Sequence, residues 1–208
     1  MSLSKLFARQ LGSPTGIVGT AAGFLWNRRN AALNDTVLRL LDLQPDDRVL
    51  DIGFGGGYLL KRMAPVASSG WLAGVDVSPA MVAYATKRCR QAVNAGRMEL
   101  KCAPAEALPY PAGRFTKICS VNSIFYWQNT AQGLGEMRRV LAGGGKAVIC
   151  FTCKGSLQHK GFAKEIHLYE SGDIERMLAA AEFIDIQTEF FSDKYRRYCC
   201  ISGRAGSG

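Results

Sequence analysis

The sequence predicts an α/β protein in which helices cover both faces of a mostly parallel sheet, and three observations support this. After residue 30, short apolar runs rich in β-branched residues alternate with stretches of helical spacing. Strands that alternate with helices of this length form βαβ units and a doubly wound parallel sheet. Near the C-terminus only a short polar stretch separates two strand candidates, which predicts a closing antiparallel hairpin. The 208 residues, 48% of them hydrophobic, suit one such domain with a sizeable core.

The strand and helix candidates are taken in chain order. Ser78 followed by Pro79 is a strong helix start, and Asn34 or Asp35 is expected to cap the first helix. The predicted strands are Arg48–Ile52, Trp71–Val77, Arg97–Cys102, Phe115–Val121, Lys146–Thr152, Ile184–Phe191 and Arg197–Gly203. The predicted helices are Asn34–Leu43, Tyr58–Ala64, Pro79–Ala95, Ala131–Leu141 and Asp173–Ala181.

The chain divides at two places. Residues 1–34 precede the first strand and carry apolar side chains at helical spacing, which predicts a helical cap segment. Residues 35–203 hold every predicted strand and form the domain, with a long connection at about 153–172. Residues 204–208 are rich in glycine and are expected to be a disordered tail.

The chain is basic, with 26 Lys and Arg against 17 Asp and Glu and a formal net charge of +9. This charge favours anionic partners, but it is scattered as on a solvated surface, so no specific nucleic acid is expected. In the first 34 residues an apolar stripe accompanies Lys5, Arg9, Arg28 and Arg29. That combination suits peripheral contact with an anionic membrane, the alternative being a helix packed on the sheet.

Neither a membrane span nor a secreted disulfide framework fits the chain. The uncharged stretch from Gln10 to Asn27 contains too many glycine and polar residues for a spanning helix. Seven cysteines are an odd number, and several lie in apolar runs, which favours buried free thiols in the cytoplasm. Cys150, Cys153, Cys199 and Cys200 are candidates for zinc, but successive strand residues point to opposite faces, so no metal site is expected.

A glycine-rich turn follows the first strand, in the run Asp51-Ile52-Gly53-Phe54-Gly55-Gly56-Gly57. Glycines let the backbone turn sharply and approach a ligand closely, and the helix that follows offers unpaired N–H groups. Because such turns also serve packing alone, the turn needs additional signals before it indicates a binding site.

Two carboxylates supply those signals. Asp76 ends the second strand, 19 residues after Gly57, where a carboxylate accepts hydrogen bonds from both hydroxyls of a ribose. Asp51 lies two residues before Gly53, where it would repel a pyrophosphate but attract a cationic amine. A nicotinamide fingerprint also requires glycine where this chain has Tyr58. Together the amine partner, the glycines and the ribose acid indicate S-adenosylmethionine, with S-adenosylhomocysteine as product.

Residues 46–152 resemble the core of the class I S-adenosylmethionine-dependent methyltransferases, in the branch that includes ubiquinone/menaquinone biosynthesis methyltransferases. Besides the glycine turn and Asp76, the resemblance rests on Ala105–Tyr110, Phe115–Trp127 and the run from Glu136 to Gly145. It implies a Rossmann-like, seven-stranded sheet with a reversed last strand, in agreement with the predicted hairpin. It also implies a methyltransferase that acts on an acceptor held at the carboxyl ends of the central strands.

The resemblance implies a set of cofactor contacts along four strand ends. They are Asp51, Gly53, Phe54, Gly55, Gly57, Asp76, Val77, Met81, Ala105, Glu106 and Val121. This chain departs from the family at Pro104, where an Asp often meets the adenine amino group. Apolar contact with Val77 and Met81, or backbone around Ala105, would hold the adenine instead.

The acceptor side is less specified by the sequence. Asn122, Tyr126 and Trp127 follow the fourth strand and are candidates for acceptor contact, with an apolar wall as the alternative. Tyr126 and His167 are the candidates for catalysis, because either side chain can orient or deprotonate a nucleophile. The expected acceptor is a small molecule, apolar or amphiphilic if the N-terminal segment covers it. A tRNA or rRNA methyltransferase and a non-catalytic cofactor-binding protein are the alternatives.

Overall fold

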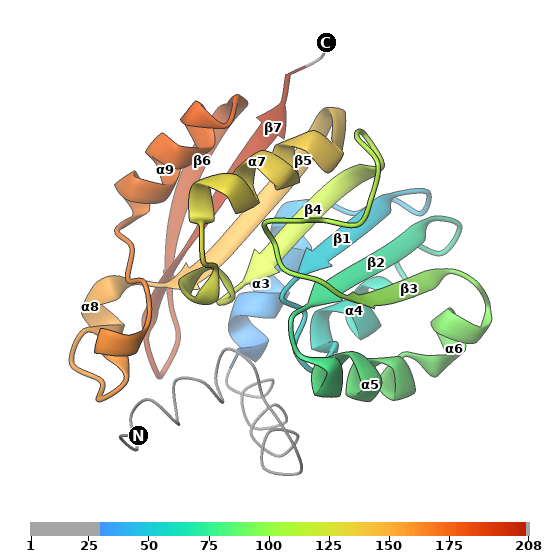
Figure 1. Ribbon diagram of the computed structural model, residues 1–208, viewed down its shortest axis with the longest axis horizontal. Coiled ribbons are helices and arrows are strands. Elements are labelled where there is room, and N and C mark those ends of the chain that lie inside the picture. Colours follow the sequence, from blue (N-terminus) through green and yellow to red (C-terminus); the bar gives the residue numbers. More distant parts are fainter. Residues whose placement is uncertain (1–29, 207–208) are drawn as a thin grey trace.

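The computed structural model describes residues 30–206 and shows one twisted sheet between helices (Figure 1). The strands lie in the order β3-β2-β1-β4-β5-β7-β6, and β7 alone runs antiparallel to its neighbours. The predicted seven-stranded sheet with a reversed last strand is therefore confirmed. The strands are β1 Arg48–Ile52, β2 Trp71–Asp76, β3 Met98–Cys102, β4 Phe115–Val121, β5 Leu141–Thr152, β6 Phe183–Ser192 and β7 Arg197–Ala205.

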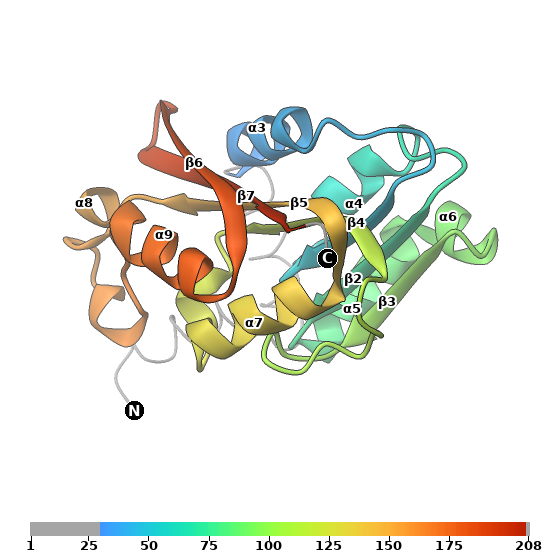
Figure 2. The same ribbon diagram turned by 90° about the horizontal axis from the view of Figure 1, so that it is seen from above.

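Helices cover both faces of the sheet because the strands carry apolar side chains on both faces. The helices are α3 Ala31–Leu41, α4 Tyr58–Met63, α5 Pro79–Arg88, α6 Arg90–Asn94, α7 Thr130–Val140, α8 Lys154–Leu157 and α9 Ser171–Ala180, with short 3-10 helices at Ile124–Tyr126 and Ala163–Glu165. On β1, Val49 joins the core under α3 and α4, whereas Leu50 and Ile52 join the core under α7 and α9. Figure 2 shows α3 on one side of the sheet and α7 and α9 on the other.

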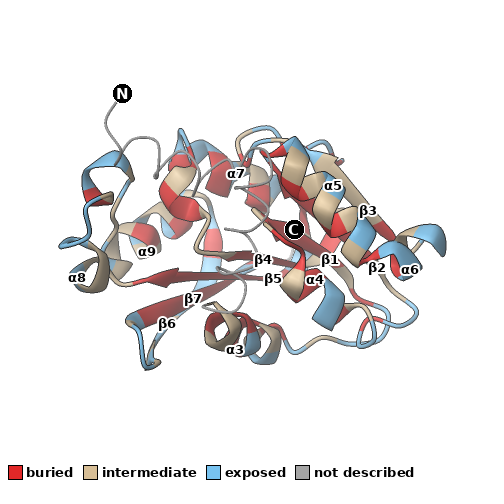
Figure 3. Cartoon of the chain, turned by 90° about the horizontal axis from the view of Figure 1, so that it is seen from below, coloured by how far each residue is buried: buried red, intermediate tan, exposed pale blue. Residues whose placement is uncertain are grey.

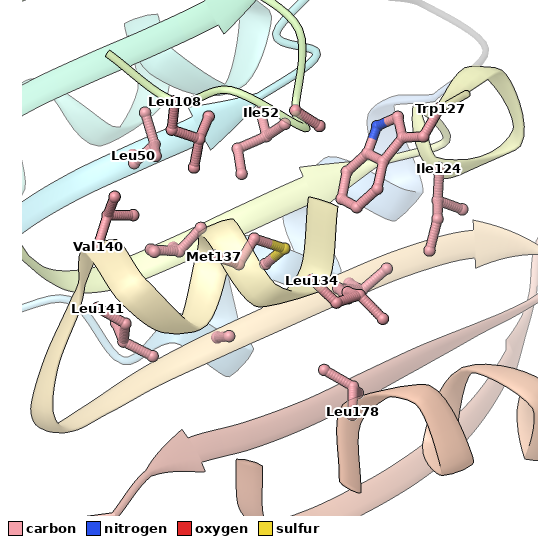
Figure 4. Close-up of a cluster of buried hydrophobic side chains, with 14 of the residues drawn as sticks. Leu50, Ile52, Leu108, Ile124, Trp127, Leu134, Met137, Val140, Leu141 and Leu178 are labelled. Atoms are coloured by element: carbon pink, nitrogen blue, oxygen red, sulfur yellow. The ribbon is translucent and has the colours of Figure 1, made fainter. Parts of the chain in front are cut away.

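Burial is concentrated in the central strands and on the inner faces of the helices (Figure 3). The core under α7 brings Met137 and Leu134 of that helix against Leu50 of β1 and Leu108 of the loop after β3 (Figure 4). Leu108 is 4% exposed although it lies in a loop, so this side chain is part of the core.

The N-terminal helix begins earlier than predicted. It starts at Ala31 and not at Asn34 or Asp35, and Asn34 is a buried residue within it. Its first turn has no side-chain cap, so the usual sequence signal for a helix start is missing. The boundary drawn between residues 34 and 35 therefore falls inside α3. The apolar stripe and basic residues of the predicted cap segment lie outside the described residues.

Three other expectations differ in detail from the structure. The helix expected at Pro79–Ala95 is interrupted at Cys89, where the backbone leaves helical geometry. Strand β5 begins at Leu141, so the glycine run after α7 belongs to it. Strand β7 continues to Ala205 and pairs with Phe183, so residues 204 and 205 are not part of a disordered tail.

The cysteines are divided between the two faces of the sheet. All seven thiols are free, and Cys150 lies opposite Cys200 in the pairing of β5 with β7. Cys200 belongs to the core under α3, whereas its neighbour Cys199 belongs to the core under α7. The four candidate sulfurs therefore do not converge on one point, as a tetrahedral metal would require. Among residues 30–206, no group of three His, Cys, Asp or Glu side chains could hold a metal ion.

A buried polar contact joins β1 to β4 at the ends opposite the glycine turn. The Asp47 carboxylate, 7% exposed, accepts hydrogen bonds from Thr116 Oγ1 at 2.6 Å and from the Gln44 amide at 2.7 Å. The same Thr116 Oγ1 accepts a hydrogen bond from the backbone N–H of Arg48 at 3.0 Å. The Thr116 hydroxyl serves here as donor and acceptor together. No helix in the described part of the chain has the length and apolarity needed to cross a membrane.

We predict that Thr116→Val destabilises the protein by about 1–3 kcal/mol, because it leaves the Asp47 carboxylate and the Arg48 N–H without this partner. Urea unfolding of the purified chain measures the difference. The matched control is Thr86→Val on α5, where the lost hydroxyl bonds only to the Val82 carbonyl of its own helix. The control should change stability by less than about 0.5 kcal/mol. Equal effects of the two substitutions would contradict the assignment.

Candidate functional site

Three glycines shape the turn between β1 and α4. Gly53, Gly55 and Gly57 have φ values of 73°, 53° and 68°, in the left-handed region that favours glycine. A Cβ at Gly53 would lie 2.2 Å from the Ser123 Cβ, and one at Gly57 would lie 2.9 Å from the Ala85 Cβ. Among residues 30–206, a Cβ at Gly55 would meet nothing within 4 Å. Gly53 and Gly57 are therefore fixed by packing, whereas Gly55 borders open space.

Asp76 holds this turn from the end of β2. Its Oδ2 accepts a hydrogen bond from the Gly55 amide at 2.8 Å, and its Oδ1 accepts from the Ser78 amide at 2.9 Å. Burial raises the pKa of Asp76, and the two N–H groups partly offset that rise. A carboxylate has about four lone-pair sites, so the oxygens retain capacity for further donors such as ribose hydroxyls.

Asp51 is a buried carboxyl without a cationic partner in residues 30–206. It is 3% exposed on β1, and burial raises its pKa to about 7. A hydrogen bond from the Cys119 thiol opposes the rise, and the Asp76 carboxylate adds to it. An uncompensated buried carboxylate is costly, and a cationic ligand group would offset that cost. The residues present thus fit a ligand that carries an amine.

The residues expected to contact adenine occupy different environments. Val77 is 47% exposed, which is unusual for a branched apolar side chain at the end of a buried strand. Met81 and Phe54 are buried, and Phe54 packs where a Cβ of Gly74 would lie. Glu106 accepts a hydrogen bond from the Asn129 amide at 3.0 Å. Val77 therefore offers apolar surface to a ligand, whereas Met81, Phe54 and Glu106 support the surrounding structure.

The loop beyond β3 and the end of β4 complete the expected cofactor set. Ala105 is buried beside α7, and a Cβ at Gly133 would lie 3.4 Å from the Ala105 Cβ. Val121, the last residue of β4, is half-buried and packs against the core on the α3 side of the sheet. Both residues lie at the carboxyl edge of the parallel strands, since Ala105 follows β3 and Val121 ends β4.

Asn122 follows β4 with a φ of 54°, an uncommon conformation for a residue with a side chain. Its Oδ1 accepts from the Thr152 amide at 2.8 Å, and its Nδ2 donates to Asn30 Oδ1 at 3.2 Å. The same Asn30 oxygen accepts from Arg196 Nη1 at 3.0 Å. The amide of Asn122 thus joins the ends of β4 and β5 to the start of α3 and to the β6–β7 hairpin.

Tyr126 and Trp127 are placed differently. Trp127 is buried, and its indole N–H donates to Ser123 Oγ at 3.2 Å, so its side chain supports the turn. Tyr126 is half-buried in the 3-10 helix, and its hydroxyl has no hydrogen-bond partner among the described residues. Burial raises the pKa of Tyr126, so the phenol keeps its proton at neutral pH.

His167 is exposed and lies beside the same segment. Its backbone N–H donates to the Phe125 carbonyl at 3.1 Å, and its ring stacks on Tyr169 with centroids 6.4 Å apart. The connection that carries His167 is therefore anchored next to Tyr126. Leu157, Ile166 and Tyr169 of this connection also pack against the core under α7.

Ser123 is a site residue that the sequence did not single out. Its Oγ donates to the Ile52 carbonyl at 3.0 Å and lies 2.6 Å from Ser120 Oγ. It thereby ties the end of β4 to the end of β1, directly under Gly53. Only the three-dimensional pairing of β1 with β4 reveals this role, because the two bonded residues are 71 positions apart.

Known methyltransferases are similar to this chain in sequence. A methyltransferase-domain family matches residues 49–145. An uncharacterized methyltransferase of Bacillus subtilis, YdaC, is 28% identical over 183 residues, which cover 88% of this chain and 97% of that protein. The ubiquinone/menaquinone biosynthesis C-methyltransferase UbiE of Geobacter sulfurreducens is 38% identical over 105 residues. That match covers 49% of this chain and 40% of the relative, so the chain spans less than half of that enzyme.

Solved structures share the fold at low sequence identity. The [4+2]-cyclase SpnF has a TM-score of 0.75 at 21% identity, covering 88% of this chain and 83% of that one. A methyltransferase of Haloferax volcanii, solved with its activator Trm112, has a TM-score of 0.78 at 15% identity, covering 99% of both chains. At these identities the likeness establishes the Rossmann-like fold alone.

We predict that Asp51→Asn stabilises the protein in the absence of ligand at pH 8. The folded pKa of about 7 lies well above that of an ordinary aspartate, so the contribution of this carboxyl is favourable at low pH. That contribution is lost as the pH rises through about 7, and Asn does not titrate. The gain should be about 1–3 kcal/mol larger at pH 8 than at pH 5, and it vanishes only below about pH 4, where the aspartate of the unfolded chain is protonated as well. Urea unfolding at both pH values measures it; a gain independent of pH would contradict the assignment.

We predict that Gly55→Ala weakens binding of S-adenosylhomocysteine at least about tenfold, roughly 1.4 kcal/mol, because the methyl group enters the space that Gly55 borders. Gly96→Ala is the matched control, since Gly96 has a φ of 69° and its Cβ would also meet nothing within 4 Å. Both substitutions should cost about 1 kcal/mol of stability from the left-handed backbone. Calorimetric titration that shows equal affinity for the two variants would contradict the assignment.

Proposed function

Because the chain belongs to the class I S-adenosylmethionine-dependent methyltransferases and uses S-adenosylmethionine as cofactor, we propose that it methylates a small-molecule acceptor at the carboxyl ends of β4 and β5. The observation that carries the proposal is the pairing of a glycine turn held by Asp76 with a buried carboxyl at Asp51 that has no cationic partner among residues 30–206. The family of quinone C-methyltransferases among the relatives supports a small organic acceptor.

The chain's own residues divide the work of holding the cofactor, whose sulfonium supplies an activated methyl group when bound. Asp51 would bind the ammonium group, and Asp76 would accept from the ribose hydroxyls while it holds Gly55. Val77 would cover the adenine with apolar surface. Positioning donor and acceptor in line accounts for much of the rate in such a transfer, so these contacts serve catalysis as well as affinity.

On the acceptor side, Tyr126 and His167 have different proposed roles. The Tyr126 phenol keeps its proton, so we assign it as a hydrogen-bond donor that orients the acceptor, rather than as a base. His167 is the candidate base for an acceptor that must lose a proton. Asn122 and Trp127 are fully engaged with protein groups, so we assign them to positioning instead of the direct acceptor contact expected from the sequence.

The surroundings of the acceptor belong to the proposal too. The connection at 153–172 is anchored beside Tyr126, which supports its role as one side of the acceptor site. Residues 1–29 are the proposed second cover, in peripheral contact with an anionic membrane. Seven free thiols favour a reducing, cytoplasmic setting for the reaction.

The proposal is tested with labelled S-adenosylmethionine and four acceptor classes: quinones, other small metabolites, lipids and tRNA. Label should enter a small organic acceptor and should be absent from tRNA. Label in tRNA would instead identify a nucleic-acid methyltransferase. Cofactor binding without transfer to any class would favour a non-catalytic binding protein.

We predict that Asp76→Ala weakens S-adenosylhomocysteine binding by about 1.5–3 kcal/mol, because a charged acceptor of several hydrogen bonds is lost. Calorimetry measures the dissociation constant. Glu99→Ala on the adjacent strand is the control, since its carboxylate pairs with Lys101 at 3.1 Å on the surface. The control should bind within about twofold, or 0.4 kcal/mol, of the unchanged protein. Unchanged affinity in the Asp76 variant would refute the ribose assignment.

A further inference from the structure

The loop between β3 and β4 borders the cofactor site but has few backbone hydrogen bonds of its own. The Ala103 amide donates to the Asp76 carbonyl at 3.2 Å, so the loop starts directly beside the ribose carboxylate. Within the loop, the Ala107 amide bonds to Pro104 and the Tyr110 amide to Leu108. A loop of this kind takes its shape from whatever else binds its backbone.

Two side chains of α7 hold Leu108 of the loop, one at its amide and the other at its carbonyl. Glu136 Oε2 accepts from the Leu108 amide at 2.8 Å, and Arg139 Nη2 donates to the Leu108 carbonyl at 3.0 Å. Arg139 Nη1 also donates to the Tyr110 carbonyl at 2.7 Å. The same two side chains bond to each other at 2.6 and 2.7 Å.

The charges of the pair suit this arrangement. The hydrogen bond from the Arg139 guanidinium lowers the pKa of Glu136, and Glu136 raises the pKa of Arg139. Both groups therefore stay ionised, and charge-assisted bonds are stronger than neutral ones. The guanidinium reaches two carbonyls and one carboxylate together, which a lysine cannot reproduce.

Apolar contacts fix the same loop against the same helix. Leu108 and Tyr110 are 4% and 7% exposed, and Leu108 lies against Met137 of α7 (Figure 4). The Tyr110 ring meets the Phe115 ring edge-on at 5.0 Å. The backbone from Ala105 to Tyr110 is thereby held by α7 and, through the Tyr110 ring, by β4.

We propose that Glu136 and Arg139 are positioning residues for cofactor binding: together they hold the loop at Ala105–Tyr110 in the shape that receives the adenine. The inference rests on the proposed function, because it takes this loop as the adenine side of the site. It assigns to two side chains of α7 an effect on cofactor affinity that acts through the loop.

The test compares neighbouring arginines on α7 in the full chain. Arg139→Gln removes the contacts to the loop, whereas Arg138→Gln removes only a contact to the Glu182 carbonyl at 3.3 Å. Titration with S-adenosylhomocysteine should give about tenfold weaker binding for the first variant and a change within about twofold for the second. Arg139→Gln should weaken adenosine binding by the same factor as S-adenosylhomocysteine binding, since the loop is on the adenine side.

Kinetics separate positioning from a general loss of structure. With an accepted substrate, Arg139→Gln should raise the KM for S-adenosylmethionine about tenfold and leave kcat at saturation within about twofold. Arg139→Lys keeps the positive charge but loses the planar guanidinium that reaches several acceptors. Its KM for S-adenosylmethionine should therefore lie between those of Arg139→Gln and Arg138→Gln. If Arg139→Gln fails to fold, Arg139→Lys and Glu136→Gln carry the same comparison.

Three results would overturn the inference: equal affinity for both arginine variants, weaker binding of S-adenosylhomocysteine with unchanged adenosine affinity, or a fall in kcat without a rise in KM. Failure of the proposed function looks different. In that case the unchanged protein itself would bind neither S-adenosylhomocysteine nor adenosine.

Discussion

The carboxylate of Asp76 is the contact on which the site depends. It accepts the amides of Gly55 and Ser78 at 2.8 and 2.9 Å, and so joins the glycine turn after β1 to the start of α5. Ser123 closes the turn from the other side by filling the space beside Gly53. The turn is thus built before any ligand binds, and Asp76 keeps lone pairs for further donors.

The buried carboxyl of Asp51 lowers the stability of the ligand-free protein when it is ionised. A carboxyl that is 3% exposed and close to a second carboxylate is less stable when ionised, as its pKa of about 7 indicates. The folded chain tolerates this because the strands around it are packed on both faces. A cationic ligand group would offset the unfavourable free energy of the buried carboxylate. Binding would therefore relieve a destabilising interaction that is already present in the ligand-free protein.

The sequence predicts the local features well and the tertiary contacts poorly. The glycine turn, Asp51 and Asp76 were identifiable because their spacing along the chain reflects a strand, a turn and the next strand. Ser123, Thr116 and the Glu136–Arg139 pair were missed because their partners are 71, 69 and 28 positions away, where no local pattern records them. The start of α3 was misplaced for a different reason, since that helix has no side-chain cap to mark it.

The central claim is that the Asp51 carboxylate binds the amine of the cofactor. The most direct test measures dissociation constants from pH 6 to pH 8 for S-adenosylhomocysteine and for 5′-methylthioadenosine, which lacks the amine. With a free-state pKa of about 7 for Asp51, affinity for S-adenosylhomocysteine should be about tenfold lower at pH 6 than at pH 8. Affinity for 5′-methylthioadenosine should not show that loss. The same pH dependence for both ligands, or for neither, would contradict the claim.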